Sequence, residues 1–313
     1  MPVYDDWESA EKLVADIARE LSIRGDRLGL VLVNDHSRPE FKHFRLEAAV
    51  RARFTEVIIV NLRRNLGHQR AIAIGLAWMH EHLPCKTVVV MDADGEDKAE
   101  DVPRLLSTFA ESGGANVVFA ERSRRAESLQ FRVFYHLYRL LHRVLTGISV
   151  RVGNFSVISF EHLSTLVAVS ELWNHYAAAV FKSRLPYKML RTTRGRRIAG
   201  QPRMNFVSLV THGLSAISVF GETVGVRLML GAALASLALI GVLVAVVVVR
   251  LTTTLAIPGW ATYTGGLLIV ALLNVITLAI ALTLLVLASR NNMSFVPMRD
   301  YSWFVKDWER VKE

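Results

Sequence analysis

Residues 87–96 read TVVVMDADGE, a short β-branched run that ends in two aspartates separated by one small residue. Valine and threonine favour strands, so the run predicts a buried strand with Asp92 and Asp94 at its carboxyl end. Side chains two residues apart on a strand point to the same side, which brings the two carboxylates together. Such oxygen ligands suit Mg²⁺ or Mn²⁺ shared with the phosphates of a substrate, and a solvated acidic loop is the alternative.

Similar β-branched runs recur before and after this strand, and each gap between them is long enough for a helix. The predicted strands are 28–33, 57–61, 87–91 and 116–120, and the predicted helices are 7–21, 41–52, 69–83 and 99–111. Alternating strands and helices are the pattern of a doubly wound α/β domain with a parallel sheet. We therefore expect one such domain in the first half of the chain.

Polar residues follow each predicted strand. The clusters are NDHS at 34–37, RRN at 63–65, DADGED at 92–97 and ER at 121–122. The carboxyl ends of the strands of an open parallel sheet form one edge, and ligands bind there. Each cluster alone is typical of an ordinary loop, but their shared position predicts a binding site at this edge.

Two long apolar stretches near the C-terminus predict membrane-spanning helices at 228–250 and 265–289. The first has no charge from Leu228 to Val249, and at 1.5 Å per residue each stretch is long enough to cross a bilayer core of about 30 Å. Residues 251–264 contain no Lys or Arg, whereas Arg227 and Arg290 flank the pair on its other side. The positive-inside rule therefore places both termini in the cytoplasm, and a pair of buried helices in a soluble protein is the alternative.

The overall composition excludes several classes of protein. The chain has 313 residues, of which 52% are hydrophobic, and this excludes a disordered chain. The single cysteine, Cys85, excludes a disulfide-stapled secreted domain and fits a reducing compartment. The net charge is +9, but no nucleic-acid-binding motif is visible and the positive-inside rule explains a basic balance, so we expect no nucleic-acid partner. No signal peptide is visible at the N-terminus.

Five motifs in a fixed order give the chain a resemblance to glycosyltransferase family 2. They are PVYDD at 2–6, NDHS at 34–37, RNLG at 64–67, DADGE at 92–96 and RIAG at 197–200. Within the family, the set most resembles the polyprenyl-phosphate glycosyltransferases, which include dolichol-phosphate mannose synthase and the bacterial glucosyl and aminoarabinose carrier-lipid transferases. The resemblance covers most of residues 2–227. It implies a Rossmann-like GT-A domain that binds a UDP- or GDP-linked sugar, and a homo-oligomer in solution.

The resemblance also implies roles for particular residues. The residues implied to bind the nucleotide sugar are Pro2, Tyr4, Asp6, Asp35, Arg64 and Asn65. Asp92, Asp94 and Glu96 are implied to surround Mg²⁺ or Mn²⁺ and the diphosphate, and Arg122 to lie near the donor or acceptor phosphate. Asp92, Asp94 and Arg122 are therefore the candidate catalytic residues, because a metal and arginines neutralise the charge that develops on a departing nucleoside diphosphate.

The sequence departs from the family pattern at three places. Relatives begin with a full strand before the Pro-x-Tyr element, whereas this sequence begins at Met1, so we expect a missing or very short first strand or a start further upstream. Residues 154–156 read NFS where relatives often have Asp-Phe-Arg, and residues 201–203 read QPR where they have Ser-Lys. The last two changes fall in segments that face the acceptor.

Basic and bulky apolar residues are interleaved between residues 128 and 147, as in a helix that lies in the lipid headgroup plane. A helix packed on the core is the alternative. The predicted domain organisation is a catalytic domain at 1–203 that includes this helix, a juxtamembrane helix at 204–227, the two spans, and a cytoplasmic tail at 290–313.

A polyprenyl phosphate acceptor explains why a catalytic domain is tied to a bilayer by a helical hairpin. Its phosphate is largely a dianion near neutral pH and is already a nucleophile. A sugar hydroxyl instead needs a general base, which contributes about 10²–10⁴ in rate. Asn154 in place of Asp therefore suits a phosphate acceptor, and we expect in-line displacement with inversion. The candidate ligands of the lipid phosphate are Arg132, Arg197 and Arg203, with nonspecific binding to anionic lipid as the alternative for each.

Two other functions compete with this interpretation. The first is a glycosyltransferase that extends a glycan on a sugar hydroxyl, but such enzymes usually show a Gln-x-x-Arg-Trp element and more spans, and residues 130–132 (QFR) do not match it. The second is a catalytically inactive membrane scaffold or a binding protein. Retention of both Asp92 and Asp94 favours an enzyme.

Overall fold

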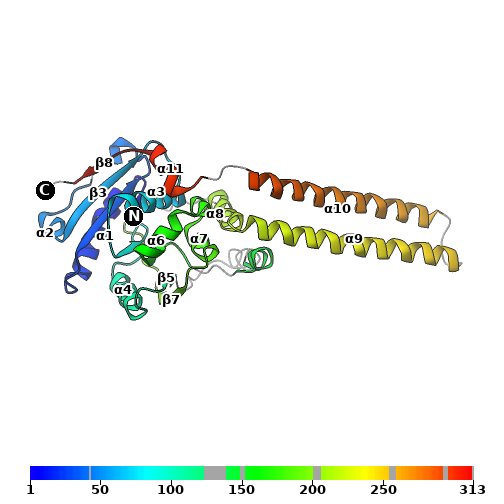
Figure 1. Cartoon of the computed structure of the whole chain (residues 1–313), viewed down its shortest axis with the longest axis horizontal. Helices are drawn as coiled ribbons and strands as arrows, with labels where there is room; N and C mark the ends of the chain where they lie inside the picture. Colours follow the sequence, from blue (N-terminus) through cyan, green and yellow to red (C-terminus); the bar gives the residue numbers. More distant parts are fainter. Residues whose placement is uncertain are drawn as a thin grey trace. The chain divides into compact units, whose positions relative to one another are not determined.

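A computed structural model describes residues 1–41, 44–122, 139–148, 152–199, 206–253, 259–291 and 295–311 (Figure 1). The described residues form two compact units. An α/β unit draws its residues from 1–133, 150–219 and 294–313, and a helical unit draws its residues from 134–149 and 220–293. The α/β unit contains the described strands and the predicted binding site.

The first sheet of the α/β unit has the strand order β1-β2-β3-β8. The strands are β1 (Pro2–Val3), β2 (Leu28–Asn34), β3 (Phe54–Leu62) and β8 (Val305–Arg310). β1, β2 and β3 are parallel, whereas β8 runs antiparallel to β3. β2 and β3 are near-continuous apolar runs buried on both faces, as expected of parallel strands covered by helices.

The second sheet has the order β4-β6-β5-β7. Its strands are β4 (Thr87–Val90), β5 (Val117–Arg122), β6 (Ser156–Ser159) and β7 (Tyr187–Thr192). The α/β class and the four predicted strands are confirmed, but the prediction of one wholly parallel sheet is wrong. β6 inserts antiparallel between β4 and β5, and β1, with two residues, pairs only with β2 among the described strands.

Helices connect and cover the strands. The α-helices of this unit are α1 (Trp7–Glu20), α2 (Ala48–Arg51), α3 (His68–His82), α4 (Asp101–Glu111), α6 (Phe160–Val167), α7 (Tyr176–Lys182), α8 (Phe206–Ser218) and α11 (Pro297–Asp300), and the 3₁₀ helices are η1 (Pro39–Phe41), η2 (Ser170–Trp173) and η3 (Tyr301–Trp303). Three of the four predicted helices are confirmed as α1, α3 and α4. The prediction of one helix over 41–52 is wrong, because Glu47 is extended (φ −57°, ψ 144°) and the α-helix α2 covers only Ala48–Arg51.

α1 packs against both sheets. Trp7, Ala10 and Val14 belong to one core cluster with Leu30 and Leu32 of β2. Another stripe of α1 belongs to a second cluster with α4, β5 and β6; its residues are Leu13, Ile17 and Leu21. A helix with apolar residues over so wide an arc buries two of its faces. α1 therefore joins the two sheets into one hydrophobic core.

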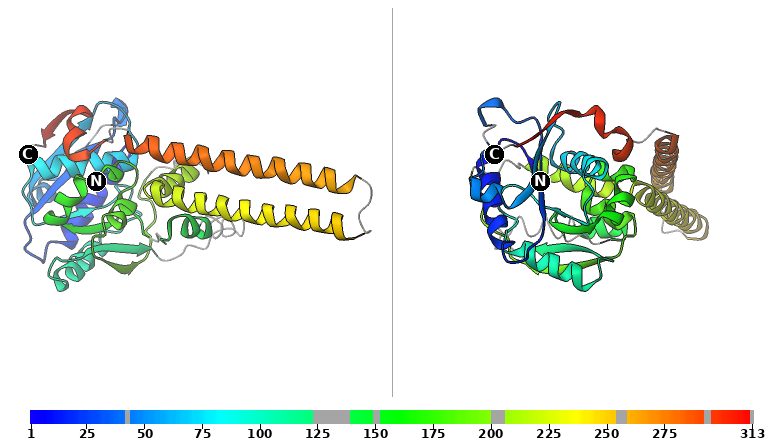
Figure 2. Two further views of the ribbon diagram at one scale, coloured as in Figure 1. Left: turned by 45° about the vertical axis from the view of Figure 1, so that its right-hand side comes forward. Right: turned by 60° about the vertical axis from the view of Figure 1, so that its left-hand side comes forward.

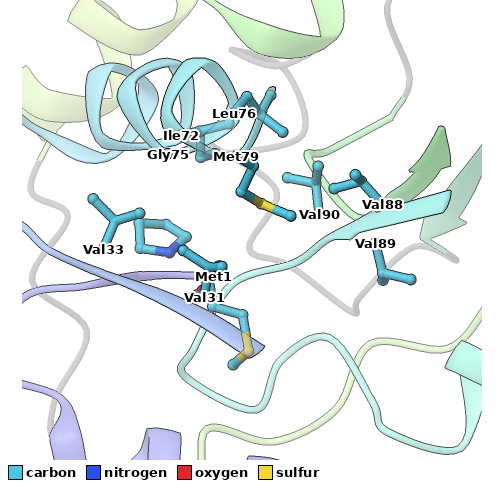
Figure 3. A pocket seen from close by; sticks show the side chains of 11 residues that line it. Met1, Val31, Val33, Ile72, Gly75, Leu76, Met79, Val88, Val89 and Val90 are labelled. Atoms are coloured by element: carbon cyan, nitrogen blue, oxygen red, sulfur yellow. Dashed lines mark hydrogen bonds between the residues drawn. The ribbon is translucent and has the colours of Figure 1, made fainter. Parts of the chain in front are cut away.

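α3 packs on the opposite face of the first sheet. Leu30 and Leu32 face α1, so Val31 and Val33, the alternate residues of β2, face α3. A Cβ on Gly75 of α3 would lie 2.5 Å from Cγ2 of Val33, which shows how near the helix comes. Residues of β1, β2, α3 and β4 line a small, partly open pocket here of about 30 Å³. Figure 3 shows the side chains around it. Its lining is mainly apolar, so this pocket belongs to the packing of α3 on the sheet rather than to the predicted site at the strand ends.

The helical unit consists mainly of α9 (Gly221–Thr252) and α10 (Trp260–Asn291), which contain the two predicted spans. They lie side by side in Figures 1 and 2, and a Cβ on Gly225 would lie 2.4 Å from Cγ2 of Val286. Both helices are long and apolar enough to cross a membrane. Only 11% of the most apolar window of α9 and none of that of α10 is buried, unlike the core helices of a soluble protein.

The predicted juxtamembrane helix at 204–227 is not one continuous helix. α8 ends at Ser218 and belongs to the α/β unit, whereas α9 begins at Gly221 in the helical unit. The backbone of Phe220 (φ −105°, ψ 26°) lies outside the helical region and separates them. Residues 139–146 of the predicted headgroup helix are helical and expose Leu140, Leu141 and Val144, while residues 128–138 lie outside the described residues.

The C-terminal residues correct the prediction of a separate tail at 290–313. Residues 295–311 form α11, η3 and β8, and they belong to the α/β unit. β3 would otherwise be an edge strand, and β8 satisfies its free backbone groups (Figure 1). Beside this ladder, the ring of Trp308 contacts that of the buried Trp78, with 5.6 Å between centroids. The chain thus returns to the α/β unit after the two long helices.

The anchoring of this segment leads to a first prediction. Tyr301 is 6% exposed, and its hydroxyl donates a hydrogen bond of 2.8 Å to Oε2 of Glu81 in α3. Tyr301→Phe is expected to lower the free energy of unfolding by about 1 kcal/mol and the Tm by about 2–4 °C in detergent. Tyr187→Phe is the control, since Tyr187 is exposed. Equal Tm values for the two variants would show that the Glu81 contact does not anchor the segment.

Candidate active site

Asp92, Ala93 and Asp94 follow β4 after one residue, Met91, at the strand end that the sequence predicts. Ala93 is buried, whereas the carboxylates of Asp92 and Asp94 are about one-fifth exposed, so small and acidic side chains alternate at the strand end. The loop is held from within, because the backbone N–H of Asp92 donates to Oδ2 of the buried Asp97 at 3.0 Å. Oδ1 of Asp94 accepts from the N–H of Glu96 at the same distance. The loop therefore presents two acidic side chains in a fixed arrangement.

A second segment, residues 194–198, lies against this loop. Its backbone N–H groups at Gly195 and Ile198 donate to the carbonyls of Glu96 and Asp94 at 2.9 and 3.0 Å. The approach is close, since a Cβ on Gly195 would lie 2.5 Å from the carbonyl oxygen of Gly95. Gly95 itself has φ +81°, which glycine adopts without strain. The acidic loop at 92–96 and the basic segment at 194–198 therefore lie in direct contact.

Arginines of the second segment neutralise the acidic loop. Arg197 pairs with Asp6 and, at 3.3 Å, with Oδ2 of Asp94, while Arg194 pairs with Glu96. Arg197 thus connects Asp6 of the N-terminal motif with Asp94 of the Asp-x-Asp motif, although the three residues are far apart in the sequence. Its predicted role as a ligand of the lipid phosphate stays a prediction. The structure places it beside the predicted donor site.

The pKa of Asp94 is raised above its ordinary value, mainly by burial. The N–H of Glu96 lowers this pKa, the charges of Asp92 and Glu96 raise it, and Arg197 opposes them. A carboxylate in such surroundings is stabilised by any further positive charge, which is what a divalent cation supplies. The electrostatics of the Asp92 and Asp94 pair therefore fit a bound Mg²⁺ or Mn²⁺.

The predicted set of three metal ligands, Asp92, Asp94 and Glu96, stays a prediction. Among the side chains that the structure describes, no three His, Cys, Asp or Glu residues are arranged to hold a metal ion. Glu96 is instead engaged by Arg194. Mg²⁺ is commonly held by one or two carboxylates together with water and substrate phosphates. Asp92 and Asp94 alone are thus sufficient candidates.

Asp35 holds the neighbouring loop at 64–67. It is 3% exposed, and its two carboxylate oxygens accept the N–H groups of Leu66 at 2.7 Å and Gly67 at 2.9 Å. The side chain of Asn65 donates back to the carbonyl of Asp35 at 3.2 Å. Burial raises the pKa of Asp35, while these N–H groups oppose the rise. The structure gives Asp35 a positioning role, and its contact with a nucleobase stays a prediction.

The remaining predicted donor residues lie around these loops. Pro2 is in β1, and Tyr4 is partly exposed beside Asp5, whose backbone has φ +56°. Arg64 is exposed with its guanidinium 5.9 Å from the ring centroid of Phe304. Arg122 ends β5, but its side chain lies outside the description, as do Arg132 and Arg203 altogether.

Sequence reasoning missed His68 and Gln69, which the structure brings to the same site. Nε2 of His68 lies 3.1 Å from Oδ1 of Asp92, and Nδ2 of Asn154 lies 2.8 Å from the same nitrogen. Gln69 accepts from the backbone N–H of Tyr176 at 2.7 Å and donates to Oδ1 of Asn154 at 3.0 Å. This fixes the amide of Asn154 with its NH₂ toward His68 and Asp92. The one available signal was that His68 and Gln69 follow the RNLG motif directly.

Comparison with known proteins identifies the family. Residues 1–167, more than half of the chain, match the model of glycosyl transferase family 2. The chain belongs to this family. It is also 28% identical over 278 residues to the undecaprenyl-phosphate 4-deoxy-4-formamido-L-arabinose transferase of Edwardsiella ictaluri (strain 93-146), with 83% of this chain and 78% of that protein covered. The predictions of a glycosyltransferase and of its α/β fold are thereby confirmed.

Proposed function

We propose that this family 2 glycosyltransferase moves a sugar from a nucleotide sugar to a polyprenyl phosphate of the undecaprenyl type, at the cytoplasmic face of a membrane. The similarity to the undecaprenyl-phosphate transferase carries this proposal. It extends over 278 residues, whereas the family match ends at residue 167, so the similarity includes sequence beyond the shared family region.

The two long helices support a membrane location. α9 and α10 expose apolar side chains along their length, and such surface is stable in lipid rather than in water. The positive-inside rule favours a cytoplasmic location for both termini and the α/β unit, because Arg227 and Arg290 flank the pair on that side and Arg250 alone stands at the edge of the connector. Nucleotide sugars and the reducing conditions that suit the lone Cys85 are found in that compartment.

The donor is proposed to bind at the carboxyl ends of β1, β2 and β4. Pro2, Tyr4 and Asp6 would line the nucleoside pocket, while Asp92 and Asp94 would hold Mg²⁺ or Mn²⁺. The bound metal supplies a positive charge that stabilises the departing nucleoside diphosphate. Arg197, already between Asp6 and Asp94, lies where it can donate to the diphosphate.

Asn154 favours a phosphate acceptor over a sugar hydroxyl. Its neutral amide cannot take a proton, and Gln69 holds it with Nδ2 directed toward the His68 and Asp92 side. A hydroxyl acceptor needs a general base, whereas the dianionic oxygen of a phosphomonoester attacks the anomeric carbon directly. The phosphate oxygen forms the new C–O bond as the bond to the nucleoside diphosphate breaks, which inverts the anomeric centre.

Acceptor chemistry provides the test of this proposal. Purified full-length protein in detergent is incubated with UDP- and GDP-sugars and Mg²⁺, together with undecaprenyl phosphate, undecaprenol or no lipid. Nucleoside diphosphate release is expected only with the phosphate, and excess EDTA should bring it to background until Mg²⁺ is restored. Equal release with undecaprenol would refute the phosphate acceptor, and release undiminished by EDTA would refute the metal.

A further inference from the structure

Three neighbouring strands of the first sheet carry a line of polar side chains into its core. Asn34 of β2 is in register with Asn61 of β3, and Asn61 is in register with Asp307 of β8. Both asparagines are buried, at 5% and 8% exposure, whereas the side chain of Asp307 is 52% exposed and its Oδ2 lies 4.0 Å from Nζ of Lys306. Nδ2 of Asn61 donates to Oδ1 of Asp307 at 2.6 Å, and Nδ2 of Asn34 donates to Oδ1 of Asn61 at 2.8 Å. The two buried amides of this line are stable only when each finds its hydrogen-bond partners.

The direction of every hydrogen bond in this line is fixed by its two ends. An ionised Asp307 accepts only, so Asn61 must turn its NH₂ toward Asp307 and its oxygen toward Asn34. Asn34 must then direct its own NH₂ toward Asn61 and its oxygen outward. That oxygen accepts the backbone N–H of Ser37 at 2.9 Å, and a backbone N–H can only donate. The carboxylate and the N–H therefore enforce the same orientation of both amides.

The line ends on the segments proposed to bind the nucleotide. Oγ of Ser37 accepts the backbone N–H of Asp5 at 3.0 Å and the indole N–H of Trp7 at 3.1 Å. Asp5 and His36, on the two connected segments, have φ of +56° and +60°. Such angles are costly for residues other than glycine and persist only where surrounding contacts hold them. The hydrogen bonds through Ser37 supply contacts of that kind.

We propose that Asp307 is a positioning residue for the nucleotide donor, and that it acts through Asn61, Asn34 and Ser37 on residues 4–7 and 35–38. The C-terminal strand then sets donor affinity without touching the donor. This inference rests on the proposed function in one respect, namely that these segments bind a nucleotide. It does not depend on which acceptor is used.

Exchanging the hydrogen-bond donor of residue 61 with the hydrogen-bond acceptor of residue 307 tests the line directly. Asn61→Asp places two carboxylates face to face and is expected to raise the Kd for UDP or GDP by about tenfold or more. In the double variant Asn61→Asp with Asp307→Asn, the new amide at position 307 donates a hydrogen bond to one carboxylate oxygen of residue 61. The second carboxylate oxygen of residue 61 still accepts from Asn34. The double variant is therefore expected to bind within about threefold of the parent. Asp307→Asn alone keeps an acceptor oxygen for Asn61 and should bind within about twofold.

Isothermal titration of the full-length protein in detergent with UDP and with GDP, in the presence of Mg²⁺ and without lipid, measures these Kd values. Glu309→Ala removes a carboxylate two residues along β8 and is the matched control, with an unchanged Kd. Asp307→Ala should raise the donor KM about tenfold with kcat within twofold.

Several results would overturn the proposal. They are a Kd for Asn61→Asp equal to that of the parent, a double variant as weak as Asn61→Asp, or no binding of either nucleotide by the parent. The last result would also remove the donor site from the proposed function. Conversely, one outcome is a double variant that restores the Kd for the nucleotide while the parent protein makes no glycolipid. That result would refute the proposed lipid acceptor and would still support the positioning role of Asp307.

Discussion

Asp94→Ala is expected to lower kcat/KM for sugar transfer by about 10³-fold or more. The carboxylate of Asp94 is partly buried, contacts Arg197 and shares its strand end with Asp92. The substitution removes one of the two candidate metal ligands. It also leaves Arg197 with only Asp6 among its described acidic partners. Loss of one preorganised group that stabilises transition-state charge costs about 10²–10³ in rate, and loss of the metal adds to it. Initial rates of nucleoside diphosphate release at saturating undecaprenyl phosphate measure the effect.

Glu100→Ala is the matched control for this experiment. Glu100→Ala also removes a carboxylate close to the acidic loop. The side chain of Glu100 is 61% exposed and pairs with Lys98. Its activity should remain within about twofold of the parent. An Asp94→Ala variant that keeps a rate dependent on Mg²⁺ at the parental level would exclude Asp94 as a metal ligand. Circular dichroism of both variants shows whether the fold is retained.

The second large effect is expected for Asp35→Asn. This change replaces one of two carboxylate oxygens with an NH₂ group that faces the N–H of Leu66 or Gly67. A buried donor left without an acceptor costs about 1–3 kcal/mol, so the free energy of unfolding should fall by about that amount. The loop that Asp35 holds also carries Arg64 and Asn65, two predicted donor residues. The donor KM is therefore expected to rise at least tenfold while the KM for the lipid changes little.

Asp26→Asn controls for the loss of one acidic charge. Asp26 is 45% exposed and pairs with Arg24 on the surface, where a single ion pair contributes little. Thermal unfolding and donor titrations of the two variants are compared side by side. A parental Tm together with a parental donor KM in Asp35→Asn would contradict the positioning role of Asp35.

The sequence predicted elements whose signal is local. β2, β3, β4 and β5 are short β-branched runs, and α9 and α10 contain long stretches without charge, so composition alone locates them. β8 has no such signal, because residues 305–310 read VKDWER and are almost wholly exposed. This segment is a strand because β3 offers it an edge. Likewise β6 has four residues, and its place between β4 and β5 depends on tertiary packing.

The candidate site divides in the same way. Asp92 and Asp94 could be predicted because a strand and two carboxylates are adjacent in sequence. His68 could not be assigned to the site, since its partners Asp92 and Asn154 are distant along the chain. Arg197 was predicted to contact the acceptor, whereas its ion pairs are with Asp6 and Asp94, from two motifs that only the fold brings together. Contacts between distant segments are what sequence patterns omit.

The mass of the lipid product tests the central claim most directly. Full-length protein is incubated with undecaprenyl phosphate, Mg²⁺ and a panel of UDP- and GDP-sugars, and the extracted lipid is analysed by mass spectrometry. The proposed function predicts a gain of one sugar residue from a donor of the panel, joined through the single phosphate of the lipid, and loss of that product in Asp94→Ala. Donor consumption that leaves the lipid mass unchanged would contradict transfer to a polyprenyl phosphate.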